Sequence, residues 1–294
     1  MNGVLVVDKP RGPTSHDVVA RVRRATGIAK IGHTGTLDPL ATGVLPLVLG
    51  RATRLARFLS GADKTYLAGI RLGAETATYD AEGVADGARP APPPGVEAAH
   101  VREALGRFGG SFLQTPPPFS AKKVAGVAAY KLARRERPVE LQPVPVTVHA
   151  IALEAYREGV ATVRLVCSAG FYVRVLAHDL GRALGCGAYL ESLRRTRAGD
   201  FDEAHAVPLE AVERDRGADG FIPMDALLPA LPPVTVTERG ARRAAHGNAL
   251  APDDLVRPRA AAAAHVRVLD PGGTLIGIAE ETAAGLLHPV VVLV

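Results

Sequence analysis

Several residue types that mark common protein classes are rare in this sequence. The two cysteines, Cys167 and Cys186, stand alone without metal-ligand spacing, and the nine histidines are scattered along the chain. We therefore expect two reduced thiols in a cytoplasmic protein, and no metal site. No apolar run approaches the roughly 20 residues that span a membrane as a helix. The apolar residues 4–7 are stopped by Asp8 and Lys9, so no signal peptide is expected there.

Aromatic residues are scarce as well: they make up 4% of the chain, and tryptophan is absent. This argues against a broad platform for stacking successive bases of a single strand. The rest of the composition is that of a folded protein, because 47% of the 294 residues are hydrophobic and 22% are charged. A chain of this length forms one large domain or two unequal ones.

Positive charge is concentrated in two regions. Residues 1–60 contain nine Lys or Arg against three Asp, and residues 122–137 contain six Lys or Arg against one Glu. Clusters of this kind suit a polyanion such as nucleic acid, although a solvated helix face is the commoner meaning of any single charge run. Because aromatic residues are few, recognition of the shape and phosphates of a folded RNA fits better than stacking on single strands.

The most informative segment is residues 32–46, Gly-His-Thr-Gly-Thr-Leu-Asp-Pro-Leu-Ala-Thr-Gly-Val-Leu-Pro. Pro39 favours extended geometry at Asp38, and the glycines allow turns that other residues forbid. The apolar run 44–49, broken only by Pro46, predicts a buried strand leading away from the loop. Asp38 is thus predicted to project from a stiff loop, a placement that suits a catalytic carboxylate. The residues alone leave an ordinary Asp-Pro turn as an open alternative.

This segment resembles, over its whole length, the signature motif of the bacterial tRNA pseudouridine-55 synthases, the TruB family. The resemblance extends over most of the first 200 residues. It includes Asp8-Lys9-Pro10-x-Gly12-x-Thr14-Ser15, Asp63-Lys64-x-Tyr66, Ser168-x-Gly170-x-Tyr172-Val173-Arg174, Asp179-Leu180-Gly181 and Leu193-Arg194-Arg195. Residues 115–123 resemble the start of the family's thumb insertion, with Lys122 where an apolar residue is usual.

The resemblance implies an isomerase that converts uridine-55 in the T-loop of tRNA to pseudouridine, with the target base flipped out of its stack. The reaction moves the sugar from N1 to C5 of uracil without redox change, so no cofactor is implied. In this family the aspartate at the position of Asp38 is the nucleophile, and an arginine at the position of Arg174 keeps it ionised, since a close arginine favours a charged aspartate.

The remaining site residues follow from the same resemblance. Tyr66 would act in catalysis and stack on the target uracil, Tyr172 and Leu193 would line the pocket, His33 would lie by the flipped nucleotide, and Lys9 would support the loop. Arg54, on a predicted short helix with Arg51 and Arg57, and Lys123 would contact the RNA backbone. Simpler alternatives stay open for each residue type. Tyr66 and Leu193 could be ordinary core residues and His33 a buried histidine, Lys9 could form a surface salt bridge, and the arginines could serve solubility alone.

Two other functions compete with this one. A non-catalytic RNA-binding or tRNA-folding protein would not need Asp38, Tyr66 and Arg174 together. A glycosidic hydrolase usually needs a second carboxylate, and no acidic residue lies between positions 18 and 37 or between 39 and 62. We therefore expect no other acidic residue near Asp38.

Strands and helices mix without a regular βαβ repeat, which predicts an α+β fold with a mixed, largely antiparallel sheet flanked by helices. Residues 1–230 are expected to form the catalytic domain, with a thumb-like RNA-binding insertion at about 117–145. Residues 232–294 are expected to form a β-rich module similar to the RNA-binding PUA domain. The protein is expected to act as a cytoplasmic monomer with tRNA as its partner.

Residues 171–184 are predicted to pass from strand to helix, which would place Tyr172 and Arg174 on one face of the strand. The basic segments 15–26, 51–59 and 120–137 are expected to border one cleft around Asp38.

Overall fold

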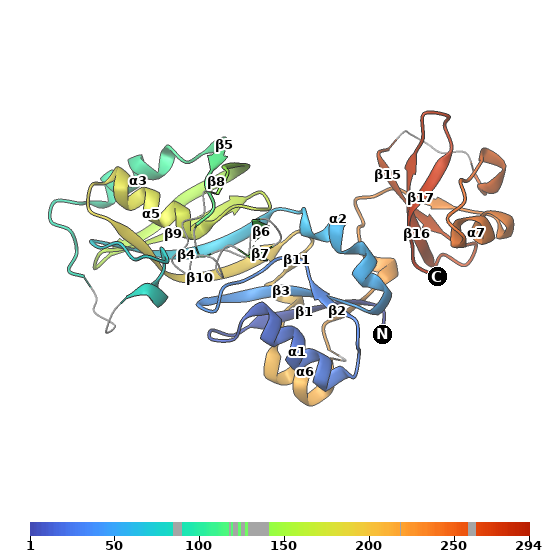
Figure 1. Ribbon diagram of the computed structural model, residues 1–294, viewed down its shortest axis with the longest axis horizontal. Coiled ribbons are helices and arrows are strands. Elements are labelled where there is room, and N and C mark those ends of the chain that lie inside the picture. Colours follow the sequence, from blue (N-terminus) through green and yellow to red (C-terminus); the bar gives the residue numbers. More distant parts are fainter. Residues whose placement is uncertain are drawn as a thin grey trace.

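A computed structural model describes residues 1–84, 90–117, 119, 123–124, 127–128, 141–217, 219–257 and 263–294 of the chain. A large sheet with its helices forms the greater part of the molecule, and a smaller β-rich unit lies at the C-terminal end (Figure 1). Among the described helices, none is both long enough and apolar enough to cross a bilayer.

The large sheet follows the order β12-β1-β3-β10-β4-β9-β8-β5, with β2, β11 and β13 attached beside this path. Two of its strand pairs are parallel, β1 with β12 and β3 with β10, and the other described pairs are antiparallel. The predicted mixed, largely antiparallel sheet is therefore confirmed. Its strands are β1 (Gly3–Lys9), β2 (Ile31–His33), β3 (Ala41–Leu49), β4 (Lys64–Leu72), β5 (Gly110–Gln114), β8 (Val144–Arg157), β9 (Val160–Cys167), β10 (Ala188–Ala198), β11 (Phe201–Asp202), β12 (Val207–Pro208) and β13 (Phe221–Pro223).

Helix α1 (Ser15–Thr26) begins and ends where its sequence requires. The Thr14 hydroxyl accepts a hydrogen bond from the Asp17 backbone amide, and the Asp17 carboxylate accepts one from the Thr14 backbone amide, so both amides at the start of the helix are satisfied. Gly27 ends the helix at a φ of 71°, a conformation that glycine adopts without strain. The buried side of the helix packs against α6 (Leu209–Asp215), which lies beside it in Figure 1.

Two further helices cover the other end of the sheet. Helix α5 (Val173–Ala183) packs on β10 and β4, and α3 (Ala98–Gly106) packs on β8 and on α5. Leu176 and Leu180 of α5, with Val101 of α3, are almost completely buried in the main core. These apolar contacts fix α5 against the sheet, and its first turn carries Arg174.

The C-terminal unit has a sheet and a core of its own. Its sheet has the order β14-β15-β16-β17, formed by β14 (Pro233–Thr235), β15 (His265–Leu269), β16 (Leu275–Glu281) and β17 (Leu287–Val292). The β15–β16 pair is antiparallel and is joined by a turn at residues 270–273, and α7 (Glu238–Ala245) packs on β16. A second core cluster, which includes Val48 of β3, Leu59 and Ile278 of β16, joins this unit to the large sheet.

The segment between β3 and β4 lies at this junction. It forms a 3₁₀ helix, η1 (Gly50–Leu55), followed by the short helix α2 (Ala56–Ser60). Its arginines Arg51, Arg54 and Arg57 donate hydrogen bonds to the backbone carbonyls of Leu293, Val292 and Val290. Because these arginines are three residues apart, they lie on one surface, and that surface contacts the C-terminal unit.

One predicted strand is wrong. Residues 169–170 form a turn, with Gly170 at a φ of 86°, and helix α5 starts at Val173. The backbone amide and carbonyl of Tyr172 bond to the side chain of Gln114, so they make no strand pairing. Tyr172 and Arg174 therefore do not alternate on a strand; Tyr172 precedes the helix and Arg174 lies in its first turn.

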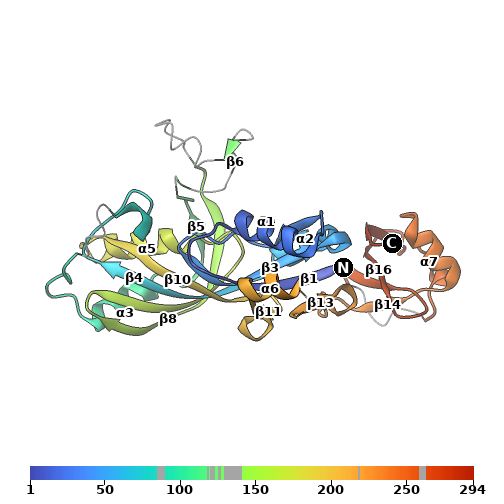
Figure 2. The same cartoon turned by 90° about the horizontal axis from the view of Figure 1, so that it is seen from below.

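The expected thumb insertion falls mostly outside the described residues, as does Lys122. Within it the structure describes the backbone of a short hairpin, β6 (Lys123–Val124) paired with β7 (Val127–Ala128). Strand β6 stands away from the large sheet near the end of β5 (Figure 2).

The remaining short helical turns are η2 (Ala81–Gly83), η4 (Glu203–His205), η5 (Met224–Ala226) and η6 (Pro252–Asp254).

Candidate active site

The loop that carries Asp38 is held by side chains from two separate elements, β1 and α1. Lys9 of β1, which is completely buried, donates from Nζ to the carbonyls of Ala41 at 2.7 Å and Pro39 at 3.4 Å. The Ser15 hydroxyl accepts from the Leu37 amide at 2.8 Å and donates to its carbonyl at 3.0 Å. These bonds bracket Asp38 on both sides, so its backbone is fixed while its side chain remains about one-third exposed, at 35%.

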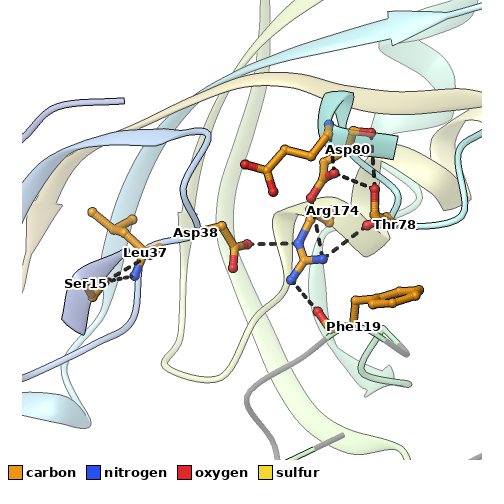
Figure 3. A network of polar contacts seen from close by, with 8 residues as sticks. Ser15, Leu37, Asp38, Thr78, Asp80, Phe119 and Arg174 are labelled. Atoms are coloured by element: carbon orange, nitrogen blue, oxygen red, sulfur yellow. Dashed lines mark hydrogen bonds and ion pairs between the residues drawn. The ribbon is translucent and has the colours of Figure 1, made fainter. Parts of the chain in front are cut away.

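Arg174 is the direct partner of Asp38. Its Nε lies 2.9 Å from Oδ2 of Asp38, and only 7% of the arginine side chain is exposed. The remaining nitrogens donate to the carbonyls of Thr78 at 3.1 Å and Phe119 at 2.9 Å. Figure 3 shows the Asp38 carboxylate pointing toward one edge of the guanidinium, with Thr78 and Phe119 on the opposite side. The guanidinium is thus held in one orientation by fixed backbone groups.

A second carboxylate binds the same guanidinium. Oδ2 of Asp80 lies 3.6 Å from Nη1 of Arg174, and Asp80 is 2% exposed. Burial raises the pKa of Asp80, while its hydrogen bond from Thr78 and the charge of Arg174 act against that rise. Burial also raises the pKa of Glu82, and the neighbouring charges of Asp80 and Asp38 raise it further. The expectation that no other acidic residue lies near Asp38 is therefore wrong, because the fold brings in carboxylates more than 40 positions away.

Tyr66 and Arg195 face each other from paired strands, β4 and β10. Tyr66 is 8% exposed; burial raises the pKa of its hydroxyl, and a hydrogen bond with Arg195 acts in the opposite direction. Arg195 is 1% exposed and donates to the carbonyls of Val44 at 2.7 Å and Gly35 at 3.1 Å. The arginine thereby connects the tyrosine to the strand and the loop on either side of Asp38.

Two buried lysines complete the positive charge around the loop. Burial lowers the pKa of Lys9 to about 8, although the nearby Asp38 carboxylate opposes the shift. Burial also lowers the pKa of Lys64 to about 8, and the adjacent Arg195 charge adds to the effect. Lys64 donates to the carbonyls of Ser60 and Ala62, so both amines are bonded to backbone oxygens.

A cavity of about 420 Å³ lies over Asp38. Six of the nine sequence-predicted site residues line it: His33, Asp38, Tyr66, Tyr172, Arg174 and Leu193. Leu193 is 8% exposed and reaches the cavity from β10, whose parallel pairing with β3 starts at Ala41. His33 contacts the ring of His16 edge to face, and burial lowers its pKa. The fold has therefore gathered at one cavity residues that are up to 160 positions apart.

The other predicted residues lie elsewhere. Lys9 is beneath the loop and holds its backbone. Arg54 lies at the junction with the C-terminal unit, where it bonds to Val292. Lys123 lies in β6, of which the structure describes the backbone alone.

The basic side chains of α1 and of η1–α2 do not line the cavity. The basic side chain of Arg21 pairs with Glu213 of α6, and from α2 only Ser60 reaches the cavity wall. The third basic segment, 120–137, lies largely outside the described residues. The expected cleft between three basic segments is therefore not formed by the arginines of the first two.

Sequence reasoning missed several residues of the site. Lys64 and Arg195 both line the cavity, two positions from Tyr66 and Leu193 on the same strands. Because side chains two apart on a strand point to one face, the alternation could have indicated both. Asp80 carries no such signal, since only the tertiary structure brings it to Arg174.

This arrangement suits nucleophilic or base chemistry by one carboxylate. Asp38 is accessible from a cavity, fixed by its loop and paired with a cation, as an activated carboxylate must be. Among the described residues, no three His, Cys, Asp or Glu side chains converge as metal ligands would.

Comparison with known proteins gives matches over nearly the whole chain. Residues 23–173 match the family model described as TruB family pseudouridylate synthase, N-terminal domain. Residues 174–231 match the tRNA pseudouridylate synthase B C-terminal domain, and residues 232–293 match pseudouridine synthase II TruB, C-terminal.

Curated relatives and solved structures agree with these matches. The chain is 44% identical to tRNA pseudouridine synthase B of Solibacter usitatus (strain Ellin6076), over the full length of both. It is also 44% identical to the protein of the same name from Burkholderia pseudomallei (strain 668), covering 98% of this chain and 96% of the relative. Among solved structures, an H/ACA RNP bound to a substrate RNA containing 2′-deoxyuridine superposes with a TM-score of 0.74 at 25% identity, over 99% of this chain and 85% of the other. A chain of a Cbf5-Nop10-Gar1 complex superposes with a TM-score of 0.73 at 27% identity, over 95% and 78%.

Proposed function

Because the chain belongs to the TruB family of pseudouridylate synthases, we propose that it converts uridine-55 in the T-loop of tRNA to pseudouridine, with Asp38 as the nucleophile. The family identifies an isomerase that acts on uridine in tRNA. The position of the uridine, the extrusion of its base and the roles of individual residues go beyond the family and belong to the proposal.

The ion pair between Asp38 and Arg174 in the cavity is the observation that supports the proposal most directly. Isomerisation breaks the bond between N1 of uracil and the sugar, turns the base, and joins C5 to the same sugar carbon. A carboxylate that attacks the sugar or the base must carry its negative charge, and the charge of the adjacent guanidinium favours that form. Hydrogen bonds to Thr78 and Phe119 keep the guanidinium in place.

The shape of the site supports extrusion of the target base. Asp38 lies within a cavity, so a base that remains stacked inside an RNA loop cannot present its glycosidic bond to the carboxylate. Tyr66 provides an aromatic wall for stacking, and Tyr172 and Leu193 add to the apolar lining. His33, which lines the cavity and contacts the ring of His16, would contact the extruded nucleotide.

The parts of the chain outside the cavity would supply affinity. We assign the catalytic domain to residues 1–230 and an RNA-binding role to the PUA-like residues 232–294, with the insertion of 117–145 gripping the RNA. Lys123 and Arg54 would contact its backbone; the exposed Arg54 retains donors besides the one bonded to Val292.

Incubation of the protein with unmodified tRNA, followed by mapping of pseudouridine at single-nucleotide resolution, tests the function. We expect one new pseudouridine, at position 55, and none in a tRNA with cytidine at that position. Modification at another uridine would overturn the proposed target. Binding of the tRNA without any pseudouridine would instead support a non-catalytic RNA-binding or tRNA-folding protein.

A further inference from the structure

A second cavity, of about 550 Å³, lies on the other side of the catalytic network. It is lined by the outward face of α5, by Tyr79 and by residues at the end of β5. The two cavities have no lining residue in common, yet Gln114, which lines the second, bonds to the backbone of Tyr172, which lines the first. The proposed reaction uses no side chain of this second cavity.

The cavity has a flat aromatic wall. The rings of Tyr79 and His178 are stacked, with centroids 4.0 Å apart and planes 12° from parallel. Tyr79 has a positive φ of 63°, which a bulky residue rarely adopts. This backbone directs the ring to the second cavity, while the adjacent Thr78 carbonyl and Asp80 carboxylate bind Arg174 in the first. The strained residue therefore connects an aromatic surface to the catalytic arginine.

Polar groups stand beside the aromatic wall. Val175, His178, Asp179 and Arg182 recur at helical spacing on one face of α5, and all four line the cavity. No described residue donates a hydrogen bond to the Asp179 carboxylate, whose pKa is raised by burial. Nδ1 of His178 is buried without a hydrogen-bond partner among the described residues and lies 4.0 Å from Oε1 of Glu75. Arg182 and Arg107 add two guanidinium groups at the wall.

The other walls are apolar. Phe108, Phe112, Leu113 and Val175 line the cavity. Leu113 is 69% exposed, the highest value among the four large hydrophobic residues of the described chain that are at least half exposed. A planar apolar face, an acceptor at its edge and nearby guanidinium groups match a nucleotide: aromatic and apolar side chains bind the base, a carboxylate accepts from its N–H groups, and guanidinium groups bind phosphate.

We propose that this cavity binds a second unpaired base of the same RNA, one that neighbours the target uridine in the loop. This inference rests on the proposed function. Gln114 and Tyr79 connect the two cavities, so a nucleotide next to the target uridine is the natural occupant. The base packs along the Tyr79–His178 stack and donates a hydrogen bond to Asp179. Arg182 and Arg107 bind the phosphate that follows it.

The test uses stem-loop RNAs that contain the target uridine and in which each neighbouring loop nucleotide is made abasic in turn. Dissociation constants are measured for the full-length protein, for His178→Ala, for Asp179→Asn, and for Asp219→Asn as a control at an exposed carboxylate. For one abasic position we expect binding to the unsubstituted protein to weaken about tenfold, the size of one stacked base. His178→Ala and Asp179→Asn should bind the intact RNA more weakly, and the same abasic change should then have little further effect.

Equal losses on abasic substitution in all four proteins, at every position, would overturn the proposal. So would wild-type affinity of both cavity variants for the intact RNA, an outcome that would direct attention to a ligand other than RNA. Asp179→Asn preserves the size of its side chain, so it gives a result even where His178→Ala does not fold. Pseudouridine formation by the unsubstituted protein on the intact RNA is measured separately; its absence contradicts the proposed function, whereas the coupling of affinities tests the second cavity alone.

Discussion

Arginine serves two different purposes in two regions of this molecule. In the cavity over Asp38, Arg174 is 7% exposed and contacts two carboxylates and two backbone carbonyls. At the junction with the C-terminal unit, Arg51, Arg54 and Arg57 are exposed, and each donates to one carbonyl near the end of the chain. The same residue type is a fixed part of the site in one region and a surface contact in the other.

Burial and the number of contacts account for the difference. A buried guanidinium with several partners has one orientation and acts at low local dielectric, where its charge has a strong effect on a neighbouring carboxylate. An exposed guanidinium with one partner competes with water, so its loss has a small effect. Substitutions in the cavity should therefore affect turnover strongly, and substitutions at the junction should affect stability moderately.

The largest effect is expected for Asp38→Asn. The amide keeps the size of the side chain but lacks its charge and nucleophilic oxygen, so turnover should fall by about 10⁴-fold or more. Folding and tRNA binding should persist, because the side chain is 35% exposed and the loop is held by backbone contacts. Single-turnover pseudouridine formation and tRNA affinity are the measurements, with Asp219→Asn as the control. Appreciable turnover by the Asn variant would show that another group, such as Asp80, does the chemistry.

Arg174→Lys is expected to have the next largest effect. Lysine keeps the charge but lacks the planar fork that reaches Asp38, Asp80 and two carbonyls together, so turnover should fall by about 10²- to 10³-fold. The KM for tRNA should change little, since the guanidinium is nearly buried. Arg164→Lys, at an exposed pair with Glu154, serves as the control. If the two variants turn over equally, the fixed geometry of Arg174 is unimportant.

The junction should show a smaller effect, mainly on stability. Replacing Arg51, Arg54 and Arg57 together by glutamine removes three bonds to the C-terminal segment, and the free energy of unfolding should fall by about 1–3 kcal/mol. Urea denaturation measures the loss. The second observation is the salt dependence of tRNA affinity for Arg54→Gln: if Arg54 also contacts a phosphate, as we propose, the slope should decrease by about one unit. An unchanged slope together with lowered stability would make Arg54 a purely structural residue.

The smallest effect concerns pH. Burial lowers the pKa of Lys64 from its ordinary value of 10.5 to about 8 in the folded protein. Between these values the unfolded chain binds more protons, so the contribution of Lys64 to stability rises with pH across this window and is lost as pH falls through about 8. Relative to Lys64→Met, the unsubstituted protein should gain about 1 kcal/mol from pH 8 to pH 10.5, because Lys64 lines an open cavity, where screening by solvent reduces the full effect of the shift. The matched control, Lys30→Met at an exposed position, should show no such trend.

Local patterns account for several elements of the secondary structure. The capping residues around α1, the apolar run of β3 and the turn between β15 and β16 each act over a few residues, so the sequence contains what is needed. The strand expected at the start of residues 171–184 is not formed, because Gln114, more than 50 positions away, binds the backbone of Tyr172. Long-range hydrogen bonds of this kind leave no local pattern.

The same distinction holds for the site. By its glycines, its proline and its resemblance to a family, the sequence alone indicated Asp38, and the resemblance added Tyr66 and Arg174 as its partners. Only the tertiary structure decided that Asp80 shares the guanidinium with Asp38, and that Lys9, Lys64 and Arg195 are buried around the loop. It also decided that Arg51, Arg54 and Arg57 face β17. Sequence determines which groups are present and how neighbouring residues are spaced, whereas burial and pairing depend on strands and helices that meet only when the chain folds.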